Sequence, residues 1–216
     1  MKLISSFLCI CLLVLVSCGE DQTKKTSWES GDEEEIEIPE DFVADTIAIR
    51  NLFDELTFPD TVMYDLLAEL GICDTVKGAE FNIHKPPCEP RFYKFFRYKK
   101  DMPWKEGFAL EIRAGVEEFY LRRFILFERI DGKLTKIQGF VANLVEQHTT
   151  HTGYYDLMLL FRDEEAGSFV VKYSWDKDRY VYRSVEAIDG YLVKEERKDS
   201  ISNVVHQRLE ENSMFF

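Results

Sequence analysis

The sequence predicts an α+β domain: a large, mostly antiparallel β-meander sheet with two N-terminal helices and a short C-terminal helix packed on it. Between Arg91 and Arg197 the chain is rich in Phe, Tyr, Val and Ile and is interrupted by turn residues, which is typical of consecutive strands. From Phe42 to Gly71, and again after Ser200, apolar residues recur at helical spacing. Because amphipathic helices have to cover their apolar faces, we expect them to pack on the sheet.

The expected strands follow one another closely enough to form a meander. Two Asp-Gly pairs, Asp131-Gly132 and Asp189-Gly190, predict tight hairpins, because both central residues of a type I′ turn need positive φ angles. The segments around them, 127–136 and 185–194, resemble each other; a repeated hairpin unit and a short turn shared by chance both explain the likeness. The strands are expected at residues 92–98, 108–114, 118–130, 134–146, 154–162, 168–175, 180–187 and 191–196.

Three segments have the apolar spacing of amphipathic helices. The first ends before Thr57, which we expect to cap the second helix together with Asp60. Gly71 stands where a helix-ending glycine belongs, and Asp199 or Ser200 is the expected cap of the last helix. The apolar stripes comprise Phe42, Ile49, Leu52, Phe53 and Leu56, then Val62, Met63, Leu66, Leu67 and Leu70, and finally Ile201, Val204, Val205 and Leu209.

The first eighteen residues, MKLISSFLCICLLVLVSC, have the composition of an export signal. Lys2 precedes an apolar run over residues 3–16, which suits a signal peptide and is shorter than the roughly 20 residues that span a bilayer. The run closes on Leu15-Val16-Ser17-Cys18, which resembles the lipobox of bacterial lipoproteins. This resemblance implies cleavage before Cys18, a diacylglyceryl thioether on its sulfur and usually an acyl chain such as palmitate on its amine. Gly19 in place of an aspartate implies, by similarity to lipoprotein sorting, the outer membrane, on either of its faces.

The resemblance also implies a division of the chain. Residues 20–41 hold ten carboxylate side chains and two lysines, within a net charge of −13 for the whole chain, and this composition favours a disordered tether. Such acidity excludes nucleic acid and a general attraction to anionic lipids, so the expected membrane contact is the lipid on Cys18. The expected parts are a signal peptide at 1–17, the lipidated cysteine and tether at 18–41, and one domain at 42–216, with a helical and loop part at 42–90, a β part at 91–198 and a C-terminal helix at 199–216.

Only Cys73 and Cys88 remain once the signal peptide is removed and Cys18 is acylated. An exported compartment permits disulfides, and a bridge between these two would stabilise a proline-rich loop by about 3 kcal/mol in the chain-entropy account. The alternative is a reactive thiol, which needs a nearby base and an electropositive setting. The disulfide is the favoured interpretation.

No catalytic or cofactor motif is recognisable, and no cofactor is predicted. His148 and His151 could ligate zinc, yet a third ligand with suitable spacing is lacking and no HExxH occurs, so a polar surface loop is favoured. Asp176, Asp178 and residues 163–165 offer oxygen ligands for calcium, but the EF-hand pattern is absent and acidic hairpin tips are common.

The stretch from Arg91 to Lys105, RFYKFFRYKKDMPWK, is the only clearly basic one in this acidic sequence. Aromatic faces beside cations suit glycans or phosphate-bearing ligands. A core strand whose long cationic side chains reach outward would have the same composition, and this is the favoured interpretation. The candidate binding face comprises Tyr93, Arg97, Tyr98, Lys99, Lys100 and Trp104.

Together these observations predict a non-enzymatic envelope protein that binds a partner protein or a glycan. An envelope hydrolase, whose carboxylates or histidines converge only in the folded chain, is the alternative, and His148 or His151 beside an acid in a deep pocket would favour it. A third class is a carrier that holds a small apolar ligand within a curved sheet.

Overall fold

The computed structural model describes residues 42–46, 53–76, 80–116 and 119–216, all of which lie in one compact unit. The expected signal peptide, the lipidation site Cys18 and the acidic tether up to residue 41 lie outside the described residues. Among the described residues, no helix has the length and apolar character that crossing a membrane requires.

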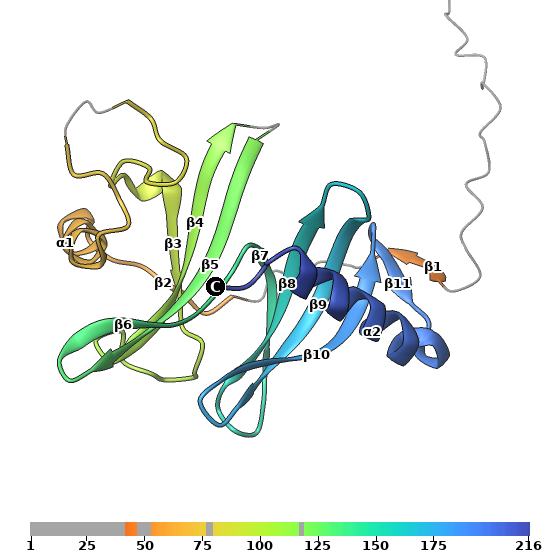
Figure 1. Cartoon of the computed structure of the whole chain (residues 1–216). Coiled ribbons are helices and arrows are strands. Elements are labelled where there is room, and N and C mark those ends of the chain that lie inside the picture. The colour runs from red at the N-terminus through yellow and green to blue at the C-terminus, as the bar shows by residue number, and fades with distance from the viewer. Residues whose placement is uncertain (1–41, 47–52, 77–79, 117–118) are drawn as a thin grey trace, which may run out of the picture. The chain divides into compact units, whose positions relative to one another are not determined.

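The described strands form two antiparallel sheets in place of the single sheet expected (Figure 1). The N-terminal sheet has the order β2 (Glu55–Leu56), β3 (Tyr93–Phe96), β4 (Gly107–Val116), β5 (Phe119–Ile130) and β6 (Lys133–Phe140). The C-terminal sheet has the order β1 (Phe42–Thr46), β11 (Tyr191–Val193), β10 (Arg179–Ile188), β9 (Gly167–Asp176), β8 (Tyr155–Asp163) and β7 (Asn143–Thr149). The helices are α1 (Asp60–Leu70), α2 (Glu195–Glu211) and the single 3-10 turn η1 (Pro90–Phe92), so the described part is mostly β.

The division between the sheets falls inside a segment expected to be one strand, residues 134–146. β6 ends at Phe140, β7 begins at Asn143, and the two strands join different sheets. At the crossing, Val141 donates its N–H to Met214 O (2.9 Å), so its hydrogen bond goes to the C-terminal tail. No proline or turn pair marks this point in the sequence, and the expectation of one continuous strand is wrong.

Both predicted Asp-Gly turns are confirmed. Asp131 and Gly132 have φ angles of 50° and 80°, and Asp189 and Gly190 have φ angles of 48° and 87°. The turns join β5 to β6 and β10 to β11, so they occupy corresponding places in the two meanders β3–β6 and β8–β11. The sequence likeness around the turns therefore coincides with a likeness in strand order.

The expected pair of N-terminal helices is not found. Where the first helix was expected, residues 42–46 form β1 along β11, and Glu55–Leu56 form β2 along β3. Short extended segments gain backbone hydrogen bonds at open sheet edges, and this long-range pairing overrides the helical spacing of the side chains. α1 lies where the second helix was expected, but its N-cap is Pro59 without a side-chain capping bond, so the role expected of Thr57 is wrong. Gly71 ends α1 with a φ of 64°.

The C-terminal helix is longer than expected, because α2 already begins at Glu195. It packs along β10 and buries Val205 and Leu209. The buried hydroxyl of Ser202 accepts the N–H of Val185 on β10 (3.0 Å). This bond fixes the helix to the strand beside it.

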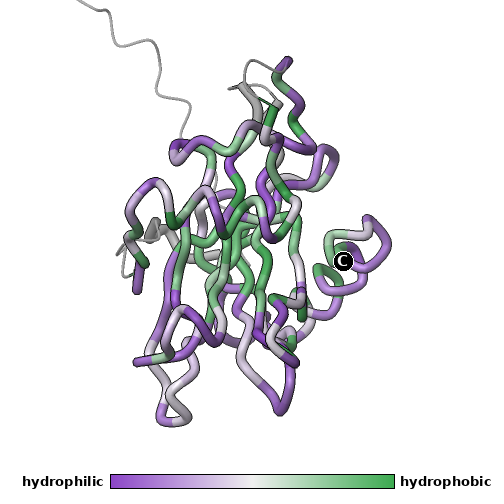
Figure 2. The backbone as a smooth tube through the Cα atoms, turned by 90° about the vertical axis from the view of Figure 1, so that its left-hand side faces the viewer, coloured by the Kyte–Doolittle hydropathy of each residue, from purple (hydrophilic) through white to green (hydrophobic). Residues whose placement is uncertain are grey.

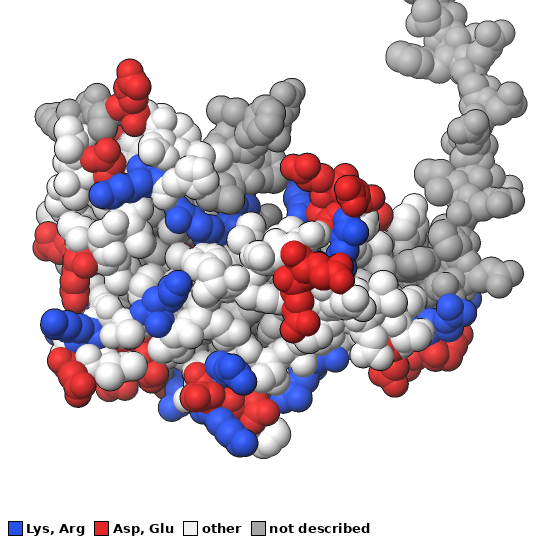
Figure 3. Space-filling model, in the orientation of Figure 1, with Lys and Arg blue, Asp and Glu red and all other residues white. Residues whose placement is uncertain are grey.

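Two large apolar cores hold the layers together, and a third, small cluster consists of Met158, Val170 and Ala187. One lies between the sheets and beneath α2, and the other lies between the opposite face of the N-terminal sheet and α1. The N-terminal sheet is therefore buried on both faces. Figure 2 shows hydrophobic positions along the central strands and hydrophilic ones along the loops, and Figure 3 shows side chains of both charges interspersed over one face. The first core includes Phe96, Phe124, Phe140, Leu157, Phe161, Tyr173 and Leu209, and the second includes Leu67, Phe95, Phe108, Leu110, Ile112 and Ile125.

The predicted disulfide between Cys73 and Cys88 is confirmed, with the two Cα atoms 5.0 Å apart. It closes the proline-containing loop that follows α1, where Asp74 N–H donates to Pro86 O (2.9 Å) and Cys88 N–H donates to Asp74 O (3.3 Å). Tyr93 OH also donates to Pro86 O (3.1 Å). The disulfide thus closes the loop, and the hydroxyl of Tyr93 connects the loop to β3.

Candidate binding cleft at the junction of the sheets

A short stretch after β3 joins the two sheets through its backbone. Residues 98–100 run antiparallel to residues 153–155 at the start of β8. The hydrogen bonds are those from Tyr155 N–H to Tyr98 O (3.0 Å) and from Lys100 N–H to Gly153 O (2.7 Å). The aromatic and basic segment therefore begins in one sheet and continues along the other, which explains its strand-like composition.

The side chain of Gln147 on β7 makes a second connection and is only 3% exposed. Its Oε1 accepts the N–H of Asp54 (2.8 Å), and its Nε2 donates to Arg97 O (2.7 Å). Arg97 N–H donates in turn to Asp54 O (2.8 Å). One buried amide thus satisfies a donor and an acceptor from the opposite sheet, which fixes the positions of Asp54 and Arg97.

Asp54 and Arg97 also bind each other through their side chains. Arg97 donates from Nη1 to Asp54 Oδ1 (2.7 Å) and from Nε to Met102 O (3.2 Å), and Tyr155 OH donates to Asp54 Oδ2 (2.9 Å). Burial, followed by the hydrogen bond to Asp54, raises the pKa of Tyr155 to about 12. Tyr155 therefore keeps its proton at neutral pH and acts as a hydrogen-bond donor.

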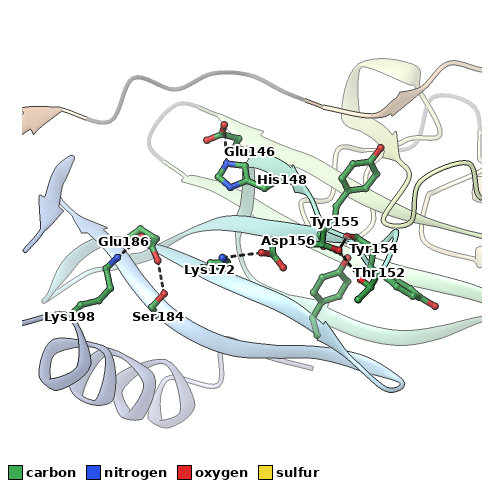
Figure 4. Close-up of polar contacts among 12 residues, drawn as sticks. Glu146, His148, Thr152, Tyr154, Tyr155, Asp156, Lys172, Ser184, Glu186 and Lys198 are labelled. Atoms are coloured by element: carbon green, nitrogen blue, oxygen red, sulfur yellow. Dashed lines mark hydrogen bonds and ion pairs between the residues drawn. The ribbon is translucent and has the colours of Figure 1, made fainter. Parts of the chain in front are cut away.

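Beside this network lies a cleft of about 890 Å³, a size typical of small-ligand sites, which we call the junction cleft. The exposed side chains of Lys100 and Asp101 border it with opposite charges. His148 points toward Glu146 in Figure 4, with 3.0 Å between Nε2 and Oε1. The lining residues are Phe53, Asp54, Arg97, Lys100, Asp101, Glu146, Gln147, His148, Thr149 and Tyr155.

No family model, curated protein or solved structure matches the chain. The chemistry of the junction cleft therefore has to be argued from its own residues. Asp54 is already bound by Arg97 and Tyr155, and none of the lining residues is a serine or a cysteine. Fixed donors and acceptors without such a nucleophile suit the binding of a ligand.

The six residues of the predicted binding face do not share one surface. Arg97 and Lys100 border the junction cleft. Lys99 lies on the ring of Tyr154, with its Nζ 4.9 Å from the ring centre. Tyr154 in turn stacks on Trp175, with ring centres 4.4 Å apart and planes 3° from parallel. Lys99 thus contributes to an aromatic stack, and only two of the six residues line the junction cleft.

The three aromatic candidates lie in apolar surroundings. Tyr93 and Tyr98 are buried, one in each core, and burial raises the pKa of both phenols. Trp104 packs against Phe58, with ring centres 5.3 Å apart. The two tyrosines therefore fit the interpretation of this stretch as a core strand. Among the six candidates, Arg97 and Lys100 remain as residues that a ligand in the junction cleft could contact.

His148 and His151 have different surroundings. His148 is paired with Glu146 in the junction cleft, and His151 is exposed in the turn between β7 and β8. Within the described part of the chain, no three His, Cys, Asp or Glu side chains are grouped so that they could hold a metal ion.

Sequence reasoning missed seven of the ten lining residues, among them Asp54, Glu146, Gln147 and Tyr155. Glu146, Gln147 and Tyr155 come from the neighbouring strands β7 and β8, and Asp54 belongs to a distant region that was expected to be helical. One local signal was present, because Gln147 is a polar residue at an inward position of a strand. A buried amide in a strand needs partners for its donor and its acceptor, and that requirement points to a neighbouring backbone.

Proposed function

We propose that this protein is a lipid-anchored component of a bacterial cell envelope, held at the outer membrane, and that its domain binds a glycan or a segment of an envelope protein in the junction cleft. The lipobox-like residues Leu15-Val16-Ser17-Cys18 support the anchor. One observation above the others supports binding: hydrogen bonds hold Asp54, Arg97 and Tyr155 in place at the wall of a cleft of about 890 Å³.

The lining of the junction cleft favours a polar ligand. Lys100 and Arg97 supply donors, and Asp101 and Glu146 supply acceptors. Phe53 adds an aromatic ring, against which a sugar or an apolar side chain can pack. Because the wall is ordered before the ligand arrives, less free energy is lost on binding.

Photo-crosslinking in living cells tests the junction cleft. A photoreactive amino acid at Thr149, which is exposed and lines the cleft, should form an adduct with a glycan or an envelope protein. The matched control is the same amino acid at Thr135, which is exposed on β6 and is not among the lining residues. Adducts that are equally abundant at both positions, or absent at Thr149, would contradict the proposal.

The lipid anchor is tested by Cys18→Ala. We expect the variant to keep its signal peptide, to migrate as a larger chain and to lose the detergent-phase partition of a lipidated protein. Globomycin, which blocks the lipoprotein signal peptidase, should likewise leave the wild-type chain at its larger size. A mature chain of unchanged size and membrane partition after the substitution would refute the anchor.

The pair formed by His148 and Glu146 favours an envelope hydrolase as a second candidate function, because an imidazole beside a carboxylate can serve as a general base. The test is hydrolysis of chromogenic esters and glycosides by the wild-type protein. His148→Gln should abolish any such activity, whereas His151→Gln, in the neighbouring turn, should preserve it. Absence of hydrolysis by the wild-type protein would leave binding as the function.

A further inference from the structure

The strand β7 forms one end of the C-terminal sheet, where it pairs with β8 alone and contacts β5 of the other sheet (Figure 1). Alternate residues of an edge strand direct their backbone N–H and C=O groups away from the neighbouring strand. Within the described ranges, no backbone–backbone hydrogen bond joins β7 to a residue outside β8. β7 also contains no proline, so none of its backbone donors is missing. Its outer edge is therefore able to pair with another strand.

The edge strand β6 of the N-terminal sheet, by contrast, is covered by the C-terminal tail. Phe216 N–H donates to Gly139 O (3.0 Å), and Val141 N–H donates to Met214 O (2.9 Å). The partly buried ring of Phe215 packs against the core between the sheets. The protein thus contains one example of an extended segment that is held at a sheet edge by backbone hydrogen bonds and an apolar side chain.

Two hollows together extend along the whole of β7. Residues 146–149 line the junction cleft, and residues 143–145 line a second cleft of about 580 Å³. Successive side chains of a strand point to opposite faces of its sheet, so a hollow over one face would be lined by alternate residues. Because the lining residues of β7 are consecutive, the open space lies along its edge. Phe53 lines both clefts, and we call the two clefts together the edge groove.

The edge groove suits an extended peptide better than a ligand held by charge. The seven residues of β7 span about 23 Å in extended conformation, which is the length of backbone available for pairing. In the second cleft, Arg113 is bound to Glu111 (3.1 Å) and Lys94 is bound to Glu55 (3.1 Å). Phe53 is only partly buried, so its ring offers a contact for an apolar side chain.

We propose that an extended segment of another envelope protein binds in the edge groove as an additional strand on β7, with one apolar side chain against Phe53. Such a segment supplies a regular row of N–H and C=O groups that matches the strand edge, whereas a glycan does not. The proposal rests on the function proposed above and names the partner of that site, because the edge groove includes the junction cleft.

Peptide selection on the mature lipidated protein in detergent tests the proposal, with a displayed library of random nine-residue peptides as the probe. Synthetic copies of the enriched peptides are then measured by fluorescence anisotropy. N-methylation of every second residue should weaken binding about tenfold, because it removes the donors directed at β7. N-methylation of the intervening residues should leave the affinity nearly unchanged. Absence of enriched peptides, or equal losses for both methylated forms, overturns the proposal.

Hydrogen exchange followed by NMR locates the bound peptide. Binding should slow the exchange of alternate amides of β7, namely those directed away from β8. The amides of Val141 and Phe216, which hold the tail on β6, are the control and should keep their exchange rates. Faster exchange of these control amides without protection of β7 would mean that the peptide displaces the tail, and this result would overturn the proposal.

Substitutions test the contact with Phe53. Phe53→Ala should weaken the peptide about tenfold, because an apolar contact within the edge groove is lost. The matched control is Phe58→Ala, another partly buried phenylalanine, which packs on Trp104 and is not among the lining residues of the edge groove. Equal affinities for the two variants overturn the proposal. If Phe53→Ala fails to fold, the exchange pattern of the wild-type complex decides in its place.

Failure of this inference is distinguishable from failure of the proposed function. Glycan adducts at Thr149 in cells, together with no enriched peptide, would leave the junction cleft as a glycan site and refute strand addition. Peptides that bind with equal losses for both methylated forms would show binding through side chains and likewise refute strand addition alone. Absence of both adducts and enriched peptides would refute the two proposals together.

Discussion

The carboxylate of Asp163 connects the turn between β8 and β9 to the last part of α2. Its Oδ1 accepts the backbone N–H groups of Glu165 (3.0 Å) and Ala166 (2.9 Å), and Arg208 binds both oxygens at 2.9 Å. Asn212 Nδ2 donates to Oδ2 as well. The pKa of Asp163 lies well below its usual range, and the largest cause is the hydrogen bonding from Arg208. Burial of the carboxylate acts in the opposite direction and raises the pKa. Protein donors therefore occupy both oxygens of this carboxylate.

Asp163→Asn should lower the melting temperature near pH 7 by on the order of 5 °C, because several hydrogen bonds to a charged group are weakened. The folded pKa lies below the unfolded value of about 4, so the carboxylate stabilises the fold fully above that pH and loses its effect as the pH falls below it. The difference in melting temperature between wild type and variant should thus shrink from about pH 5 to pH 2. Asp178→Asn, at the exposed turn between β9 and β10, is the control; a difference that stays constant with pH would contradict this account.

Among the elements, the C-terminal residues act as an additional short strand on the free edge of β6. Phe216 N–H donates to Gly139 O (3.0 Å), and Phe215 pairs with Phe140 in an antiparallel bridge. The Phe215 ring enters the core between the sheets, where its centre lies 6.1 Å from those of Phe140 and Phe161. Phe216 lies against Gly139, where a Cβ atom would meet its ring at 2.8 Å, and is 46% exposed. The tail therefore covers a sheet edge that would otherwise be open to pairing with another chain.

Phe215→Ala should lower the free energy of unfolding by about 2 kcal/mol, less than for a fully buried phenylalanine, because the ring is only partly buried. Phe216→Ala removes a more exposed ring and should cost less than about 1 kcal/mol. Urea denaturation monitored by fluorescence measures both values. Equal losses for the two variants would show that the bridge to β6, and not the buried ring, holds the tail.

The disulfide should stabilise the folded protein, because it restricts the loop of residues 73–88 in the unfolded chain and so lowers the entropy of that state. Replacing both Cys73 and Cys88 with alanine is expected to lower the free energy of unfolding by about 3 kcal/mol. A reductant should destabilise the wild-type protein to a similar extent and leave the double variant unchanged. A wild-type protein that is insensitive to the reductant, although its thiols have become reactive, would contradict this role.

Local chemistry explains which elements the sequence could predict. The hairpins at Asp131-Gly132 and Asp189-Gly190 follow from φ requirements of two adjacent residues, and both are confirmed. The strand β1 could not be predicted in this way, because its partner β11 lies about 150 positions away along the chain. The crossing at Val141 has no turn signature either, since its hydrogen bond goes to Met214. The candidate site depends on the same long-range pairing, and so only Arg97, Lys100 and His148 of its lining were singled out beforehand.

In the whole domain, one glutamine side chain from each sheet forms hydrogen bonds with the backbone of the other side. Gln147 of the C-terminal sheet binds the N–H of Asp54 and the carbonyl oxygen of Arg97. Gln138 of the N-terminal sheet binds the N–H (2.8 Å) and the carbonyl oxygen (2.9 Å) of Tyr180 on β10. Each amide thus substitutes for a residue of a neighbouring strand, and the sheets are joined by polar contacts as well as by their apolar core.

These two connections should have equal effects on stability and different effects on the junction cleft. Gln147→Leu leaves a buried N–H and a carbonyl oxygen without partners, and Gln138→Leu does the same at Tyr180, so each should cost about 2 to 4 kcal/mol in urea denaturation. Hydrogen exchange separates them, because Gln147→Leu should speed exchange of the Asp54 amide, whereas Gln138→Leu should speed that of the Tyr180 amide. Only Gln147→Leu loosens Asp54 and Arg97, and so only this variant should abolish the adduct formed from Thr149. Loss of the adduct in both variants would mean that the junction cleft depends on the mutual position of the sheets as a whole and not on the local network around Gln147.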